Sequence, residues 1–147
     1  MHDDASNIFN LYLEAVEEQP KMTTDEYGNK RWRLHGKLHR RDGPAIEGAG
    51  GSKSWWLHNK LHREDDPAVE DANGSKLWYL HGKLHRKDGP AVEDASGNKA
   101  WFLHGQHYES AEAWAKDVLK ERNEPHDDAA VVAFLRPILK KDASASL

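Results

Sequence analysis

One pattern of residues recurs every 23 positions, and it limits the chain to a repeat architecture more than any other feature does. Each copy begins with a Trp, a Leu and a His, and a second His, an Arg, an Asp and a Pro follow. The Trp positions are Trp32, Trp55, Trp78 and Trp101, and the Pro positions are Pro44, Pro67 and Pro90. A fixed period of this size is typical of stacked supersecondary units. The chain holds three full copies and a fourth that keeps only its first half.

Each copy predicts a β-hairpin with a two-residue turn. The Trp-x-Leu segment is a short strand, and the two residues after it, such as His81-Gly82, tolerate the positive φ of a type I′ turn. A two-residue turn also fixes the register between the two strands. The expected pairs are Leu80 with Lys83, Tyr79 with Leu84, and Trp78 with His85. The Asp-Gly-Pro bend then ends the return strand, because Pro cannot donate to a ladder, and a short Ala-Val-Glu strand follows.

The His, Arg and Asp residues of the repeat look like a metal or catalytic cluster, but their spacing favours a structural role. Equivalent histidines in successive hairpins lie two strands apart, roughly 9–10 Å, whereas Zn–N bonds are about 2.0–2.1 Å. Tyr108 also replaces the second His in the last copy. Catalytic groups are normally assembled once, not three times at equal spacing. We therefore expect no metal, no cofactor and no enzymatic activity, with Arg-Asp pairs bracing the bends. A role of the histidines in ligand or partner contact is the less favoured alternative.

Composition narrows the classes of partner. The 147 residues suit one domain, and the net charge of −4 favours neither nucleic acid nor an anionic membrane surface. There is no Cys, so disulfides and thiolate sites are excluded. The N-terminal MHDD lacks the basic and apolar segments of a signal peptide, and no apolar run reaches the length of a membrane span. We therefore expect a cytoplasmic protein.

The flanks of the repeats predict helices. Residues 1–20 contain an amphipathic helix over about 6–18, with its apolar residues at helical spacing and Pro20 at its end. Residues 110–141 predict two helices, with Ser110 and Asp127 as their N-caps and a kink at Pro137. Residues 142–147 are expected to be a flexible tail. These helices are expected to protect the edges of the sheet. The alternative is that a terminal helix mediates a homodimer or holds a partner.

Residues 78–93, WYLHGKLHRKDGPAVE, carry a resemblance to a known family. They resemble the MORN-like hairpin repeats of many bacterial and bacteriophage proteins, and the resemblance covers about residues 25–109, or about 3.5 units. It implies an α+β fold in which an antiparallel meander of 23-residue β-hairpin repeats is flanked by one N-terminal and two C-terminal helices. The His-Arg-x-Asp-Gly-Pro-Ala part departs from the eukaryotic consensus of the family. Such families are mostly scaffolds and binding surfaces.

We therefore expect a non-catalytic protein-binding module. The resemblance implies a narrower hypothesis, a phage-encoded accessory protein that inhibits a host defence protein in the host cytoplasm. Residues that differ between copies are free of the constraints of the repeat, so a partner is expected to contact these. The candidates are Arg33, Trp56, Arg63, Glu64, Asp66, Tyr79, Arg86 and Phe102. The alternative function is sequestration of a nucleotide or another small molecule between aromatic side chains and Arg, and a His/Arg/Asp hydrolase is less favoured.

Overall fold

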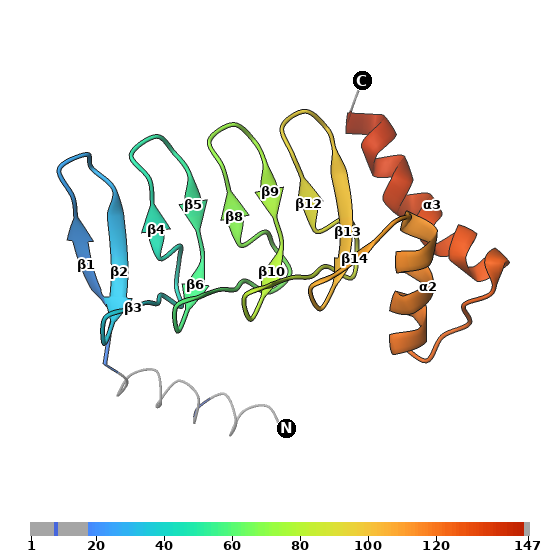
Figure 1. The fold of residues 1–147 in the computed structure, drawn as a ribbon, viewed down its shortest axis with the longest axis horizontal. Helices are drawn as coiled ribbons and strands as arrows, with labels where there is room; N and C mark the ends of the chain where they lie inside the picture. Colours follow the sequence, from blue (N-terminus) through green and yellow to red (C-terminus); the bar gives the residue numbers. More distant parts are fainter. Residues whose placement is uncertain (1–7, 9–17, 146–147) are drawn as a thin grey trace.

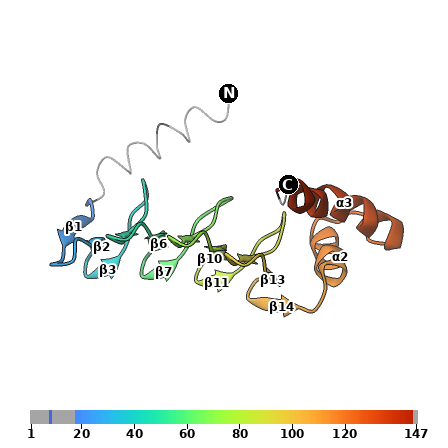
Figure 2. The same cartoon turned by 90° about the horizontal axis from the view of Figure 1, so that it is seen from above.

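The computed structural model describes residue 8 and residues 18–145, and the fold is α+β. A long antiparallel meander of short strands is followed by two helices (Figure 1). The strands follow one another along the length of the molecule, with β1 at one end and both helices at the other, in both views (Figure 2). The N-terminal helix predicted over about 6–18 lies almost entirely outside the described residues.

One set of strands forms a continuous sheet. Its order is β1-β2-β4-β5-β8-β9-β12-β13-β14, with β3 paired to β2. Its strands are β1 Lys21–Thr24, β2 Lys30–Leu34, β3 Lys37–Leu38, β4 Ile46–Glu47, β5 Lys53–Ser54, β8 Val69–Glu70, β9 Lys76–Leu77, β12 Val92–Glu93, β13 Lys99–Leu103 and β14 Gln106–Tyr108. The Ala-Val-Glu segments supply β8 and β12, as expected. The turns at Gly50-Gly51, Asn73-Gly74 and Ser96-Gly97 lead into the next strand of the sheet.

The His-Gly turns form a second row of hairpins. The two middle ones are separate two-stranded sheets, β6 Trp56–Leu57 with β7 Lys60–Leu61, and β10 Tyr79–Leu80 with β11 Lys83–Leu84. Both turn residues have positive φ, for example 50° at His81 and 79° at Gly82. The register pairs Tyr79 with Leu84 and Leu80 with Lys83, which confirms the predicted turn and its alignment.

Successive hairpins are joined by backbone hydrogen bonds. The amide of Gly82 donates to the carbonyl of Leu61 at 2.8 Å, and the amide of Arg63 donates to the carbonyl of Tyr79 at 3.1 Å. The same bonds recur at the junctions before and after this one. The row of hairpins therefore has its own ladder, and the position of one hairpin depends on that of the next.

The meander begins earlier than predicted. The repeats were expected from residue 25, but β1 at 21–24 pairs with β2 as β4 pairs with β5. The Asp25–Asn29 loop has the same backbone hydrogen bonds as the Asp94–Asn98 loop 69 residues later, three periods along the chain. The shared Asp-x-x-Gly-Asn pattern is a signal in the sequence that marks this extra half-unit.

The two helices follow the last hairpin. Helix α2 spans Ala111–Glu121 and helix α3 spans Asp128–Ala145. The Ser110 hydroxyl accepts from the amide of Ala113 at 3.1 Å, and the Asp127 carboxylate accepts from the amide of Ala130 at 2.9 Å, so both predicted caps are confirmed. Helix α3 is continuous through Pro137. It also runs four residues past its predicted end at 141, because the Asp-Ala-Ser-Ala segment contains no Gly or Pro that would stop it. No helix in the described part of the chain is long and apolar enough to cross a membrane.

The largest hydrophobic core lies between the helices and the last hairpin. Leu103 of β13 packs with α2 and α3, and Trp114 and Val118 are fully buried there. Trp114 also stacks on Trp101 with ring centroids 4.6 Å apart, and Trp101 and Tyr108 border the same cluster. Helix α2 therefore covers the C-terminal end of the meander.

Candidate interaction surfaces

The recurring Trp residues are covered by arginines from their own units. The guanidinium carbon of Arg86 lies 3.8 Å from the centre of the Trp78 ring, and the same distance separates Arg63 from Trp55 and Arg40 from Trp32. Each guanidinium also bonds the carbonyl of the following Pro and a Glu on the neighbouring strand. The fourth unit has Glu109 where the others have Arg, and there Trp114 covers Trp101. These arginines therefore hold the fold together, by cation–π contact and hydrogen bonds.

The second His of each unit pairs with the recurring Trp as predicted, since the amide of His85 donates to the carbonyl of Trp78 at 3.0 Å. Its ring also makes a contact with another histidine that the sequence did not predict. Each second His meets the turn His of the next hairpin, so the rings of His62 and His81 lie 4.5 Å apart, and Nδ1 of His62 accepts the backbone amide of His81 at 3.0 Å. Two further pairs repeat this contact, His39 with His58 at 4.5 Å and His85 with His104 at 4.3 Å. The spacing of the sequence compares equivalent histidines of successive units and the two histidines of one unit, so it does not predict a contact between the second His of one unit and the turn His of the next. In the described residues, no group of three or more His, Cys, Asp or Glu side chains could hold a metal ion.

The bend of the second unit differs from the other two. In the first and third units Arg40 pairs with Asp42 at 3.0 Å and Arg86 pairs with Asp88 at 2.9 Å, as predicted. A Cβ atom on Gly89 would lie 2.7 Å from the guanidinium carbon of Arg86, so a larger residue there requires the Arg side chain or the bend to move. The second unit has Asp66 there. Its chain takes another path, with Asp65 at φ 66° and Asp66 3.7 Å from Arg63.

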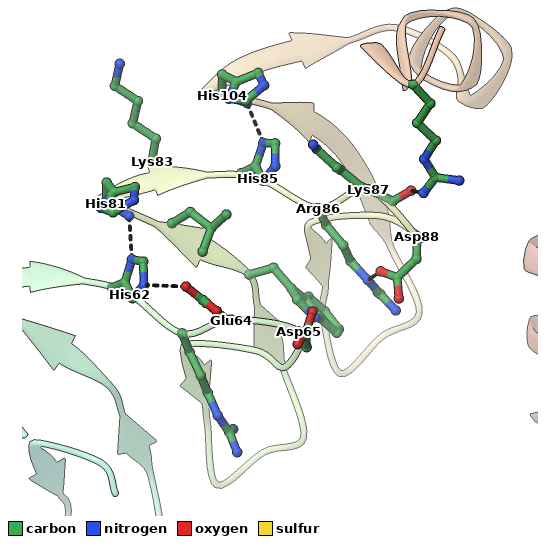
Figure 3. A pocket seen from close by; sticks show the side chains of 14 residues that line it. His62, Glu64, Asp65, His81, Lys83, His85, Arg86, Lys87, Asp88 and His104 are labelled. Atoms are coloured by element: carbon green, nitrogen blue, oxygen red, sulfur yellow. Dashed lines mark hydrogen bonds and ion pairs between the residues drawn. The ribbon is translucent and has the colours of Figure 1, made fainter. Parts of the chain in front are cut away.

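A groove of about 810 Å³ lies beside this altered bend (Figure 3). Its lining combines histidines, cationic side chains and three carboxylates. The lining residues are His62, Arg63, Glu64, Asp65, Trp78, Leu80, His81, Lys83, His85, Arg86, Lys87, Asp88, His104 and Arg122. Several of its charges are already paired, since Arg86 bonds Asp88 and Lys87 lies 3.6 Å from Glu121. The side chains that line the groove are mixed in charge.

The opposite face of the strands is aromatic and aliphatic. Along β13 the side chains alternate, so Ala100 and Phe102 lie on the face opposite Trp101. The same alternation places Trp56 and Tyr79 on the side of Phe102. We call this surface the aromatic face. It consists of Trp56, Tyr79, Phe102, Leu38, Leu61, Leu84, Ile46, Val69, Leu77 and Val92, all half-buried.

On the other side of the sheet, the middle strands carry paired charges. The cross-strand partners there alternate in sign, with Lys53 between Glu47 and Glu70, and Lys76 between Glu70 and Glu93. Opposite charges in these positions stabilise the pairing. On the aromatic face, Leu77 pairs with Val69 and with Val92, both apolar. Ser54 pairs with Ile46 and with Val69 there, and Arg31 pairs with Ile46. Among the described residues, the cluster that the helices form with the sheet contains none from the two middle units.

The residues predicted to bind a partner fall into two groups. Arg33, Trp56, Tyr79 and Phe102 lie on one face of the strands, with Arg33 exposed at its end. Arg63, Glu64 and Arg86 line the groove on the other side, and Asp66 is exposed at the bend. The structure therefore does not bring all eight together. Sequence reasoning did not include His62, His81, His85 and His104 of the groove, because it treated them as turn and strand residues.

Comparison with protein-family models, with curated proteins and with solved structures gives no match. Function is therefore argued from the geometry of these surfaces.

Proposed function

We propose that the chain is a non-catalytic, repeat-based protein-binding module whose aromatic face holds a partner protein. The observation that carries this proposal is the row formed by Trp56, Tyr79 and Phe102, which are half-buried and lie outside the helix-covered core. Large aromatic side chains supply much contact area and are enriched at interfaces. The aromatic face also has no carboxylate among its ten residues, so a partner could cover it without burying an unpaired anion.

The spacing of the row indicates what a partner would present to it. Equivalent residues in successive units are two strands apart, about 9.5 Å at the usual spacing of a sheet. Residues seven apart on an α-helix are about 10.5 Å apart. A helix lying across the strands could therefore place apolar side chains at heptad spacing between the aromatic residues. A flat surface with apolar side chains about 10 Å apart would fit equally.

The resemblance to MORN-like repeats of bacterial and bacteriophage proteins supports the same class of function. Within it, we propose a host protein as the partner and inhibition of a defence protein as the outcome. This narrower step is supported by that resemblance alone. A homodimer through a terminal helix is the competing arrangement, and the mass of the free protein in solution distinguishes the two.

The experiment compares capture of a bacterial protein by the wild-type chain and by a variant with Trp56→Ala, Tyr79→Ala and Phe102→Ala. Lys76→Ala, on the charged side of the sheet, is the matched control. We expect the aromatic variant to lose the captured protein while it stays folded, and the control to keep it. Capture that survives in the folded aromatic variant would contradict the proposal.

The alternative function, sequestration of a nucleotide, is favoured by the groove with its Trp, His and cationic side chains. A nucleobase needs an open aromatic face on which to stack. Trp78 is only 7% exposed, and the guanidinium of Arg86 already lies over its ring. A thermal-shift series with nucleotides tests this alternative, and it requires a concentration-dependent rise in Tm that Lys83→Ala or Arg122→Ala reduces.

A further inference from the structure

The contacts between successive hairpins depend on neutral histidines. Nδ1 of His62 accepts the amide of His81 at 3.0 Å, and Nδ1 of His85 accepts the amide of His104 at 2.8 Å. Nδ1 of His39 accepts the amide of His58 at 3.1 Å. A ring nitrogen can accept only while it carries no proton, so the proton of each ring must sit on Nε2. A protonated imidazole has two donors and no acceptor, and it would leave the facing amide without a partner.

We propose that these histidine junctions are acid-sensitive, and that the junction between the second and third hairpins is a hinge that opens before the junction between the third and fourth as pH falls. This proposal concerns the connection between units and does not depend on the binding function of the aromatic face. The hinge consists of His62, at the end of the second hairpin, and His81, in the turn of the third.

The charged groups around the junctions favour this order. His62 faces His81 from the next turn and Glu64 from its own bend, and Nε2 of His62 lies 3.9 Å from Glu64. His85 faces His104 from the next turn, Lys87 from its own bend and Glu121 from α2. The carboxylate of Glu64 stabilises a protonated His62, whereas the ammonium group of Lys87 opposes protonation of His85. His62 should therefore take up a proton at a higher pH.

Burial acts on both rings in the same direction. It lowers the pKa of His62 below its ordinary value of 6.5, and His81 lowers it further while Glu64 raises it. Burial likewise lowers the pKa of His85, with smaller lowering effects of His104 and Lys87 and an opposing effect of Glu121. A base whose pKa is lower in the folded than in the unfolded chain stabilises the fold above the unfolded pKa. That stabilisation is lost as pH falls from about 6.5 through the folded-state pKa.

The middle junction lines the groove, as the junction of His85 with His104 also does. Figure 3 shows His62 and His81 joined across the gap between two hairpins, with His85 and His104 forming the next pair and Glu64 beside His62. The altered bend after His62 holds Asp65 at a positive φ, which is less favourable for Asp than for Gly. Protonation of His62 would therefore break a hydrogen bond beside the groove, next to a bend whose conformation differs from that of the other units.

Amide exchange measured by NMR from about pH 7.5 to about pH 4.5, across the range in which His titrates, tests the proposal on the wild-type chain. We expect the His81 amide to lose protection at a higher pH than the His104 amide. Loss of both amides together with the whole backbone would overturn the hinge, because it would indicate global unfolding. Protection of the His81 amide throughout this range would also overturn it.

Two variants separate protonation of His62 from other acid effects. His62→Asn keeps an acceptor in place of Nδ1, as Asn59 Oδ1 accepts the amide of Leu38 at 3.2 Å, but it cannot be protonated in this range. We expect the His81 amide to stay protected in this variant, whereas His107→Asn, on β14 and outside the junctions, should leave the wild-type profile unchanged. Glu64→Lys gives the second unit a cation like Lys87 and should move loss of the His81 amide to lower pH. An unchanged profile in both His62→Asn and Glu64→Lys would overturn the proposal.

Discussion

The two faces of the same strands differ in how their aromatic side chains are covered. On one face the recurring Trp residues each lie under an Arg or, in the last unit, under Trp114. On the other face Trp56 and Tyr79 are half-buried and lie outside the core that the helices form. The face with identical residues in every unit is closed by its own side chains. The face whose residues vary is the one that we propose contacts a partner.

Under the proposed function, one face of the repeat provides stability and the other binds the partner. A period of 23 residues repeats the Trp–Arg contact at each unit, so the closed face is built by local contacts between neighbours. The residue after each recurring Trp, which is aromatic in the last three units and Arg33 in the first, points the other way, and nothing in the Trp–Arg contact fixes its identity. Trp56, Tyr79 and Phe102 can therefore differ without loss of the fold.

The largest expected effect on the face that carries the recurring Trp residues, which we call the closed face, comes from removal of Trp114, which covers Trp101. Trp114→Ala should lower the free energy of unfolding by about 3–5 kcal/mol, the usual cost of truncating a buried aromatic residue. Trp114 is fully buried, stacks on Trp101, and donates from Nε1 to the carbonyl of Arg86 at 3.0 Å. Urea denaturation measures the change. A loss below about 1 kcal/mol would show that α2 does not close this end.

Substitution of Gly89, which lies against the guanidinium of Arg86, tests the same face with a smaller expected loss of stability. Gly89→Ala should destabilise the protein by about 1–3 kcal/mol, because its Cβ would lie 2.7 Å from the guanidinium carbon that covers Trp78. Gly50→Ala is the matched control, since a Cβ there meets no atom within 4 Å. Equal denaturation midpoints for the two variants would contradict the account of the Arg86 contact.

The altered bend offers the reverse experiment. Asp66→Gly gives the second unit the residue found in the other two, so Asp65 can leave its positive φ and pair with Arg63. We expect a gain in stability of about 1 kcal/mol, the typical cost of a left-handed conformation for a residue with a side chain. Thermal unfolding measures it, with Asp71→Gly as a control at a loop outside the bend. A loss of stability would mean that Asp66 supports the bend that it occupies.

The smallest expected effect concerns Tyr108, which takes the place of the second His in the fourth unit. The hydroxyl of Tyr108 donates to the Asp117 carboxylate at 2.7 Å, and burial together with this bond raises the pKa of Tyr108 to about 12. The folded chain then favours the protonated phenol, so this stabilisation is present below about pH 10 and is lost as pH rises through about 12. Tyr108→Phe should cost about 0.5–1.5 kcal/mol at neutral pH. It should also flatten the fall in stability between pH 10 and pH 12, which alkaline titration of Tm would detect.

Local features of the fold could be predicted from the sequence, and contacts between units could not. The turns and the register followed from His-Gly and His-Asn pairs, because a two-residue turn leaves one alignment. The caps Ser110 and Asp127 followed from side chains whose partner lies three residues away. The pairing of His62 with His81 depends instead on how far one hairpin is displaced from the next, which no local rule specifies.

The same limit explains the other differences. Trp114 lies on the buried face of α2, and its stacking on Trp101 depends on where α2 docks. For the arginines, the sequence predicted only the local pairs with Asp, which Arg40 and Arg86 make, and not their position over the Trp rings. The altered bend at Asp66 could be located by comparison of the copies. The conformation of this bend could be explained only from the structure. In the third unit, the guanidinium of Arg86 leaves little room for a side chain at the equivalent position, Gly89.

The most direct test of the account compares two neighbours, Trp78→Ala and Tyr79→Ala, by urea denaturation of the free protein. Their side chains lie on opposite faces of the same strand. We predict a loss of about 3–5 kcal/mol for Trp78→Ala, which removes a side chain only 7% exposed and clamped by Arg86. Tyr79→Ala should cost no more than about half as much, because its ring is already partly in water. If Tyr79→Ala proves the more destabilising of the two, the closed and open faces have been assigned the wrong way round.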